Sequence, residues 1–475
     1  MEDDTKATPA PTPDVNGRAT AGTTDPGVSG ATAPVEPKGP PSRSAWRYAW
    51  AWVPSLYFAE GVPFLIVMSL AGDLYVQLGV DNDTMARATS LLYLPWVIKP
   101  LWSPFVEVFG KQRWWIAGTQ ALVAVALGLA AWVLPGASFF SATLALFWVI
   151  AFASATHDIA ADGFYIDALP DRAQAWFVGL RSTFYRLSMI FVTGGMLQAA
   201  GVLDNQMEKP LAWAWTFAGA AVLFGAFALY HALALPRLPK ETAASLAGGA
   251  PGAPRENRLA SVASQVRDTI VSFFQKPGIV PAIVFLLLYR FSEGQLTKLA
   301  KPFLFAPRSE GGMALEVETV GVIYGYVGVG MLTLGGILGG MAAAKGGLRR
   351  WLLPMALAMN LPNALYALLA AWTPDSYWLV TGVVAAEQFG YGFGFAAYLL
   401  YMIHIARGEH STAHYSICTG FMALGMAIPG FISGDIQREL GYFWFFVWVV
   451  VATIPSLLVT AYIARTVPED AFAEG

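Results

Sequence analysis

Long apolar stretches alternate with short polar ones along most of the chain. Windows of about 20 predominantly apolar residues, the length at which a helix crosses a bilayer, recur twelve times. One long polar connection, near 236–277, separates the first six windows from the last six. The pattern predicts an all-α membrane protein with twelve transmembrane helices in two six-helix halves, a count typical of transporters. The expected spans lie near 46–78, 86–109, 113–134, 138–168, 173–200, 212–235, 278–305, 317–344, 349–372, 376–406, 411–435 and 441–465.

The same pattern sets the expected domain boundaries. Residues 1–44 are rich in Pro, Ala, Thr, Gly and Asp and hold no apolar run, so we expect a disordered cytoplasmic tail that is not a secretory signal. The two six-helix halves should occupy 45–236 and 277–466. A cytoplasmic linker is expected at 237–276 and a C-terminal tail at 467–475.

Basic residues near the expected span ends indicate the orientation. They gather on the side of the membrane that holds the N-terminus. The opposite connections hold only Arg87, Lys209, Arg308 and Arg438. By the positive-inside rule, both termini should be cytoplasmic.

Composition supports a membrane protein and excludes other classes. Of the 475 residues, 56% are hydrophobic and only 13% are charged, which excludes an ordinary soluble domain. The net charge of −3 gives no reason to expect nucleic acid as a partner. The lone Cys418 can form no internal disulfide, and no phosphate-binding Gly-x-x-x-x-Gly-Lys-Ser/Thr loop is present, so no ATP or other cofactor is expected. The expected partners of this monomer are a lipid bilayer, protons and a small-molecule substrate.

The most informative charges lie within the expected fourth span. His157, Asp158 and Asp162 follow an almost wholly apolar run, and charged side chains at membrane depth usually face a wet cavity or a bundle interior. Asp158 and Asp162 are four residues apart, which places them on one helix face, about 6 Å apart along the axis. Partly desolvated carboxylates this close share protons. We therefore predict that Asp158 and Asp162 are the proton-coupling residues.

Two more charges lie at similar depth in spans one and two. Glu60 precedes Gly61 and Pro63, which break the helix and suit it to lining a cavity. Lys99 lies about midway along span two and should pair with a carboxylate of span four or span one. Both side chains are candidates for binding substrate.

Spans five, seven and ten complete the set of candidates. Arg181 and Arg186 can bind a carboxylate or phosphate, or neutralise the fourth-span aspartates. Arg290 and Glu293 are three residues apart and can bridge within span seven, while Glu387 precedes a run of glycines and aromatic residues. Spans one and seven occupy equivalent places in the two halves and are both broken beside charges, which indicates a central site. The predicted substrate-binding residues are Glu60, Lys99, His157, Arg181, Arg186, Arg290, Glu293 and Glu387, and no metal site is predicted.

The fourth span also carries a family resemblance. Residues 154–163 (SATHDIAADG), followed by 167–170 (DALP), resemble the fourth-span signature of the muropeptide permease family, a branch of the major facilitator superfamily shared with acetyl-CoA transporters. The resemblance implies that superfamily's fold and proton-driven import of anhydro-muropeptides across a bacterial inner membrane, with Asp158 and Asp162 tied to transport. His157 stands where a glutamine is often seen, and Glu60 where a small residue is commoner. Weaker matches are 61–63, 99–104, 186–187, Glu387, Gly430 and Gly434.

One alternative keeps the fold and changes the cargo to acetyl-CoA or another anionic metabolite. Arg181, Arg186, Arg290 and Lys298 would then bind phosphates. Glycosylation at Asn82, in the sole Asn-x-Ser/Thr sequon, would favour a eukaryotic organelle.

A second alternative is a membrane-embedded hydrolase or metal site. It would use His157, Asp158 and Asp162. A metal ion needs a third or fourth ligand in a set geometry, and His404 and His410 lie at the inner end of span ten without obvious convergence on the aspartates.

Overall fold

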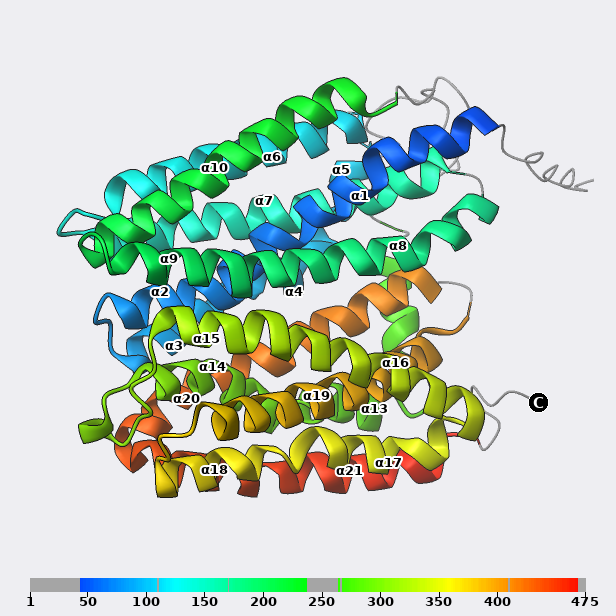
Figure 1. Cartoon of the computed structure of the whole chain (residues 1–475). Coiled ribbons are helices and arrows are strands. Elements are labelled where there is room, and N and C mark those ends of the chain that lie inside the picture. The colour runs from blue at the N-terminus through cyan, green and yellow to red at the C-terminus, as the bar shows by residue number, and fades with distance from the viewer. Residues whose placement is uncertain are drawn as a thin grey trace, which may run out of the picture. The chain divides into compact units, whose positions relative to one another are not determined.

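The computed structural model describes residues 43–108, 111–169, 171–236, 264, 267–408 and 411–468. This part of the chain is almost entirely helical and has no strand, which confirms the predicted fold class (Figure 1). Most of the expected N-terminal tail, most of the expected linker and the last seven residues lie outside the described residues.

The helices run side by side along one bundle and reverse direction at each connection (Figure 1). The described chain begins and ends on the same side of the bundle, which we call the terminal end. The opposite side, with the connection at 78–81, is the distal end. A chain that enters and leaves at the same end crosses the bundle an even number of times.

The first half contains six crossings, three of them in several pieces. A π-helix interrupts the first and fifth crossings, and a 3₁₀ turn interrupts the second. In chain order the elements are α1 (Arg43–Leu65), η1 (Ile66–Leu70), α2 (Ala71–Gln77), α3 (Asn82–Leu91), α4 (Leu94–Ile98), η2 (Lys99–Leu101), α5 (Ser103–Val108), α6 (Gln112–Val133), α7 (Phe139–Ala168), α8 (Asp171–Met189), η3 (Ile190–Met196), α9 (Leu197–Asp204) and α10 (Lys209–Ala234).

The second half repeats this arrangement, with a π-helix in its second crossing. The expected spans 349–372 and 376–406 coincide closely with its third and fourth crossings. In chain order the elements are α13 (Ile279–Leu288), α14 (Phe291–Phe305), η4 (Arg308–Glu310), α15 (Val317–Val322), η5 (Ile323–Gly328), α16 (Val329–Gly346), α17 (Leu348–Asn360), α18 (Asn363–Trp372), α19 (Tyr377–Ala406), α20 (Ser411–Val451) and α21 (Thr453–Thr466).

Two features reconcile these helices with twelve crossings. The described residues contain ten helices long and apolar enough to span a membrane, and one of them, Ala413–Thr466, has 54 residues. A straight helix of that length would measure about 80 Å, more than twice a bilayer core, but Gly441 has a positive φ of 72° and the chain turns back there. The second crossing is not among the ten because Pro95, Pro100 and Pro104 divide it into short helices.

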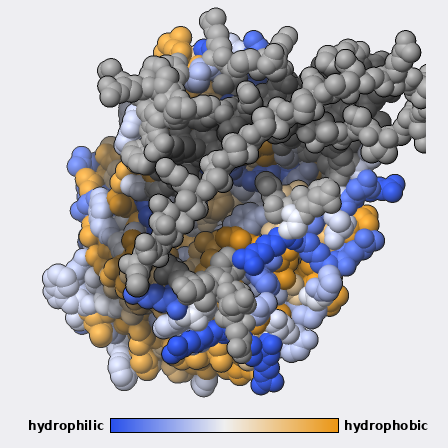
Figure 2. Space-filling view, turned by 90° about the vertical axis from the view of Figure 1, so that its right-hand side faces the viewer, coloured by the Kyte–Doolittle hydropathy of each residue, from blue (hydrophilic) through white to orange (hydrophobic). Residues whose placement is uncertain are grey.

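The hydrophobic core is shared between the halves at the distal end only. One buried cluster joins residues of both halves, including Leu74, Val320 and Phe446. The other two clusters lie toward the terminal end, and each belongs to one half: one includes Trp52, and the other includes Tyr401. Among the described residues, the halves are therefore fused by packing at the distal end and have separate cores at the terminal end. Figure 2 looks onto the terminal end, where hydrophilic residues lie across the face among hydrophobic ones.

The halves meet along a seam formed by the second and fifth crossings of the first half. Helices α3 and α4 pack on α20, α9 packs on α15, and the π-helices η3 and η5 pack on each other. A Cβ atom at Gly325 would lie only 2.0 Å from the Cα of Gly194, so the two backbones touch there. This close approach requires glycine on η5.

Candidate functional site

The fourth-span aspartates each bind a cation from a neighbouring crossing. The ammonium of Lys99, in η2, pairs with Asp158, and the guanidinium of Arg181, in α8, pairs with Asp162. The Asp158 side chain is 21% exposed and that of Asp162 is 44% exposed, although both lie well inside α7. The predicted pairing of Lys99 with span four is confirmed. These charges are neutralised and still accessible, which is the condition expected of residues that line a wet space.

Glu60, in α1, adds a second carboxyl group beside Asp158. The two carboxyl groups lie within electrostatic range of each other, beside the ammonium of Lys99. The Glu60 Oε2 atom is buried, and no described donor reaches it. The next residue, Gly61, fixes this position, because a Cβ there would lie 1.9 Å from Ser188 Oγ of α8. Glu60, Asp158 and Lys99 thus form a group of two acids and one cation.

Two tyrosines hold Arg181 between their rings. The guanidinium carbon lies 4.1 Å from the ring centre of Tyr57 and 4.6 Å from that of Tyr165, both distances suited to cation–π attraction. The Tyr57 hydroxyl also donates to Asp162 at 3.5 Å. Neither tyrosine is among the site residues predicted from the sequence. Their spacing could have indicated them, because Tyr57 lies three residues before Glu60 and Tyr165 three after Asp162.

The second half contains a charged group of its own. Arg290, at the break between α13 and α14, donates two hydrogen bonds of 2.6 Å to Glu293, so the predicted bridge within span seven is confirmed. The same guanidinium also donates to the Tyr391 hydroxyl at 3.0 Å. Glu387 is 3% exposed; Gln388 donates to its carboxylate, and it forms no ion pair with a described residue.

Tyr185 connects the two charged groups across the seam. It lies within electrostatic range of Glu60 and Asp158 in the first half and of Tyr391 in the second. Tyr93 in turn lies within electrostatic range of the Arg290–Glu293 pair. No tyrosine is among the site residues predicted from the sequence, but Tyr185 and Tyr391 lie within electrostatic range of each other across the seam.

Arg186 faces the seam without an acidic partner among the described residues. Its Nη1 atom donates to Thr333 Oγ1 of α16 at 3.0 Å. The residue five positions earlier, Arg181, satisfies Asp162 instead. The structure therefore assigns the neutralising role to Arg181 and leaves the guanidinium of Arg186 available to an anion.

His157 lies apart from the carboxylate group. It is 2% exposed and belongs to a chain of hydrogen bonds within the first half. Its Nε2 lies 2.9 Å from Gln120 Nε2, Gln120 Oε1 lies 2.9 Å from His231 Nδ1, and His231 Nε2 lies 3.0 Å from Ser55 Oγ. These contacts join α7 to α6, α10 and α1. His157 thus holds the helix that carries Asp158, and it makes no contact with the charged group itself.

The metal-site alternative finds no support in this geometry. The carboxylates of Asp158 and Asp162 face Lys99 and Arg181, and His157 points to a different side of α7. Within the described ranges, no three or more His, Cys, Asp or Glu side chains gather as ligands. His410 lies outside those ranges.

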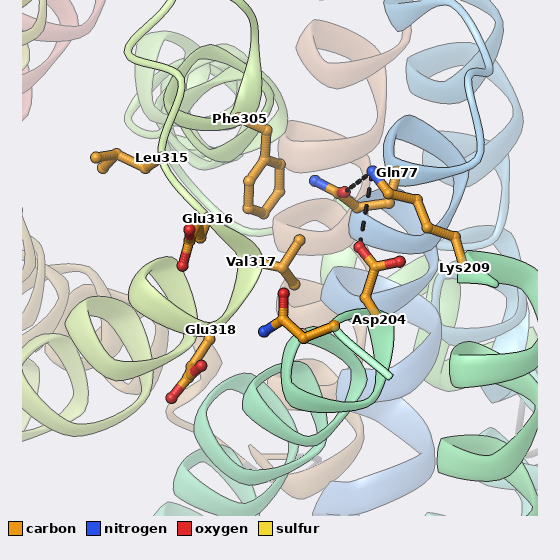
Figure 3. Close-up of a pocket in the computed structure, with 10 residues that line it drawn as sticks. Gln77, Asp204, Lys209, Phe305, Leu315, Glu316, Val317 and Glu318 are labelled. Atoms are coloured by element: carbon orange, nitrogen blue, oxygen red, sulfur yellow. Dashed lines mark hydrogen bonds and ion pairs between the residues drawn. The ribbon is translucent and has the colours of Figure 1, made fainter. Parts of the chain in front are cut away.

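A small pocket lies at the distal end of the seam, away from these residues. Its volume is about 200 Å³, and Asp204 and Lys209 of the first half face Val317 of the second across it (Figure 3). The Lys209 ammonium lies 3.8 Å from Asp204 and donates to Gln77 at 3.5 Å. None of the predicted site residues lines this pocket.

Two six-helix halves that enclose opposed charged groups at mid-membrane define a multi-pass membrane transporter. The family model of the Major Facilitator Superfamily matches residues 55–430. The chain belongs to the Major Facilitator Superfamily, and the predicted fold is confirmed.

Known relatives and solved structures agree with this assignment. The chain is 26% identical over 419 residues to the anhydromuropeptide permease of Escherichia coli (strain K12), covering 86% of this chain and 79% of the relative. It is 23% identical over 428 residues to an uncharacterized protein of Haemophilus influenzae, covering 87% and 94%. The fold resembles that of the nucleoside transporter NupG (TM-score 0.63, 15% identity, 89% and 98% covered). It also resembles the xylose transporter XylE of E. coli in an inward-open conformation (TM-score 0.61, 11% identity, 89% and 96% covered). The matched proteins with an assigned activity are transporters and not enzymes.

Proposed function

We propose that this protein is a secondary active transporter that imports anhydro-muropeptides or related cell-wall sugar-peptides together with protons across the bacterial inner membrane. The similarity to an anhydromuropeptide permease supports the cargo. The single observation that supports coupling is the ion pair of Lys99 and Asp158 with a second carboxyl group, that of Glu60, within electrostatic range.

The coupling follows from the charges of this group. Lys99 balances one of the two acids, so the group is neutral when Glu60 and Asp158 hold one proton between them and negative when they hold none. A rocking motion of the halves keeps the two carboxyl groups together but changes their exposure to water, and with it their affinity for that proton. Such a difference in affinity is sufficient for proton binding to bias the opening of one side over the other. Asp162, paired with Arg181, is the second candidate for coupling.

The substrate would lie between the two charged groups. Tyrosine rings suit stacking on a sugar, while Arg186, Arg290, Glu293 and Glu387 suit the charged ends of a peptide. Because Tyr185 lies near both groups, a ligand in the seam would contact both halves at once. His157 contributes by holding α7 and not by touching the substrate.

The orientation of the protein in the membrane, its oligomeric state and its conformation are part of the same proposal. The terminal end is cytoplasmic, in keeping with the basic residues near it, and the protein acts as a monomer. Since the distal seam is packed and the cores separate toward the terminal end, this conformation would open to the cytoplasm and release substrate there.

The test is uptake of labelled anhydro-muropeptide into vesicles that contain the protein, measured with an inward proton gradient and after that gradient is collapsed. We expect accumulation that requires an inward proton gradient. Asp158→Asn should reduce accumulation by at least about 100-fold. The control is Asp375→Asn, the same change at an exposed distal carboxylate, which should leave accumulation unchanged. Accumulation that continues after the gradient is collapsed, or in Asp158→Asn, would contradict the coupling.

Acetyl-CoA or another anionic metabolite is the second candidate cargo. The observation in its favour is that the guanidinium of Arg186 has no acidic partner in the described part of the chain. Uptake of a labelled coenzyme A derivative would favour this cargo over the first if unlabelled coenzyme A derivatives inhibit that uptake and muropeptides do not.

A further inference from the structure

Most of the basic residues in the interior of the bundle have a carboxylate partner. Lys99, Arg181, Arg290 and Lys301 each form an ion pair. Lys298, on α14 one turn before Lys301, forms none with any described residue. A cation within a membrane span normally pairs with an acid or faces a functional space, so this ammonium lacks an explanation in the folding of the bundle.

The immediate surroundings of Lys298 offer one neutral acceptor. Its Nζ donates to Thr89 Oγ1 at 2.9 Å, and the Thr89 hydroxyl donates in turn to the Met85 carbonyl at 2.8 Å. Nζ also lies 5.6 Å from the ring centre of Tyr93. An ammonium has three donors, and these contacts use one of them. Two donors and the whole charge remain to be satisfied.

The nearest acid cannot supply the missing charge, because it is already engaged. Asp73 lies within electrostatic range of Lys298, but its carboxylate accepts a 2.6 Å hydrogen bond from Lys301. Lys301 also donates to Ser69 at 2.8 Å. Asp73 and Lys301 therefore form a closed buried pair, and Lys298 has no acid of its own in the described part of the chain.

The position of Lys298 connects it with the central site. Its aliphatic stem is held where α20 comes close, since a Cβ at Gly430 would lie 3.2 Å from Lys298 Cε. Lys298 and Arg290 are eight residues apart on the same crossing, about 12 Å along the helix axis. Tyr93 lies between them, near the ammonium and within electrostatic range of the guanidinium. Tyr93 thus places Lys298 and Arg290 along the same stretch of the seam between the halves.

We propose that Lys298 is a specificity-determining residue that binds a carboxylate of the transported sugar-peptide. The assignment rests on the proposed function and names the chemical group recognised on the distal side of the site. A carboxylate would accept the two unused N–H donors and balance the charge, which is what a poorly hydrated ammonium requires. A peptide portion that ends in a free carboxylate supplies this group.

The test compares uptake of one anhydro-muropeptide with that of its C-terminal amide. We expect wild-type protein to prefer the acid by about 10- to 100-fold in kcat/KM, the range of a hydrogen bond to a charged group. Lys298→Gln should bring the ratio near one, and Lys298→Arg should restore part of the preference. Lys345→Gln, at an exposed lysine near the terminal end, should leave the ratio unchanged.

The outcomes separate this assignment from the proposed function. Uptake of the acid by Lys298→Gln with an undiminished preference over the amide contradicts the role of Lys298 alone. Uptake of neither form by wild-type protein contradicts the proposed function and the assignment with it. Should Lys298→Gln fold poorly, as judged by thermal unfolding in detergent, Lys298→Met at the same position gives the ratio in a variant that keeps the aliphatic stem. Loss of the preference on adding acetate, but not chloride, to wild-type protein further supports recognition of a carboxylate.

Discussion

Six ion pairs of this transporter form two groups that differ in what they join. Toward the middle of the membrane, each pair joins residues of one half. At the distal end, three pairs join one half to the other, while Lys209–Asp204 and Arg308–Asp375 each stay within one half. The first group is Lys99–Asp158, Arg181–Asp162 and Arg290–Glu293, and the second is Asp73–Lys301, Arg87–Asp435 and Asp83–Arg438.

This difference predicts different roles. A rocking motion of the halves leaves the first group intact and must break the second, because only the second crosses the seam. The buried apolar clusters follow the same division, being shared at the distal end and separate toward the terminal end. Charges within a half should therefore govern proton and substrate binding, and charges between halves should govern the balance between the two conformations.

The largest effect should come from Lys99→Met, within the first half. It leaves Asp158 and Glu60 together without a cation, and removing one partner of a buried pair reduces the free energy of unfolding by about 3–5 kcal/mol. We expect proton-driven uptake to be lost and the unfolding temperature in detergent to fall. Exchanging the pair, Lys99→Asp with Asp158→Lys, should recover the unfolding temperature but not the uptake. Wild-type uptake by Lys99→Met would show that the group has no part in coupling.

Asp73→Asn should act on conformation instead. It removes the buried pair with Lys301 that joins α2 to α14. We therefore expect the free-energy difference between the two conformations to shift by about 1–3 kcal/mol in favour of the one that is open at the distal end. Spin labels at exposed positions Gln206 and Ser309, introduced with Cys418→Ser, should report longer distances across the distal end.

The matched control is Glu293→Gln, the same kind of change at a pair within one half. It should alter substrate affinity and leave the distance between the labels as in wild-type protein. If Glu293→Gln lengthens the distance as much as Asp73→Asn does, then the distinction between the two groups of ion pairs is wrong.

Gly325→Ala probes the seam without changing any charge. The new Cβ would lie 2.0 Å from the Cα of Gly194, so the backbones of η3 and η5 must move apart. Overpacking of this kind reduces stability by about 1–2 kcal/mol, and we expect slower uptake with nearly normal substrate binding. Gly330→Ala, in the same crossing with no atom within 4 Å of the added Cβ, should have no such effect. Equal uptake by the two variants would exclude a role for the contact.

Much of this arrangement can be predicted from sequence because charges in a membrane must be neutralised. That requirement predicted a partner for Lys99 in span four or one and the bridge between Arg290 and Glu293, and both are present. The apolar windows gave the twelve crossings even where Gly441 and the prolines interrupt the helices. These features depend on local composition and spacing alone.

The direction in which each side chain points from its helix could not be predicted in the same way. His157 and Asp158 are neighbours in the chain, but successive helical residues are rotated by about 100°, so they face different partners. Which of Arg181 and Arg186 neutralises Asp162 depends on how α8 is rotated against α7. The pair of Asp73 and Lys301 joins residues 228 positions apart, and no local pattern indicates it.

The smallest effect should come from Arg87→Gln, at an ion pair that also crosses the seam but is exposed. The Arg87 side chain is 46% exposed, and Asp435 keeps a second basic neighbour, since Arg438 lies 3.7 Å away. Exposed pairs contribute little and are screened by salt, so uptake should stay within about twofold of wild type, with any difference disappearing at high ionic strength. The distance between labels at Gln206 and Ser309 should not change. A shift as large as that of Asp73→Asn would mean that crossing the seam matters more than burial, and that the exposed pairs hold the distal end closed.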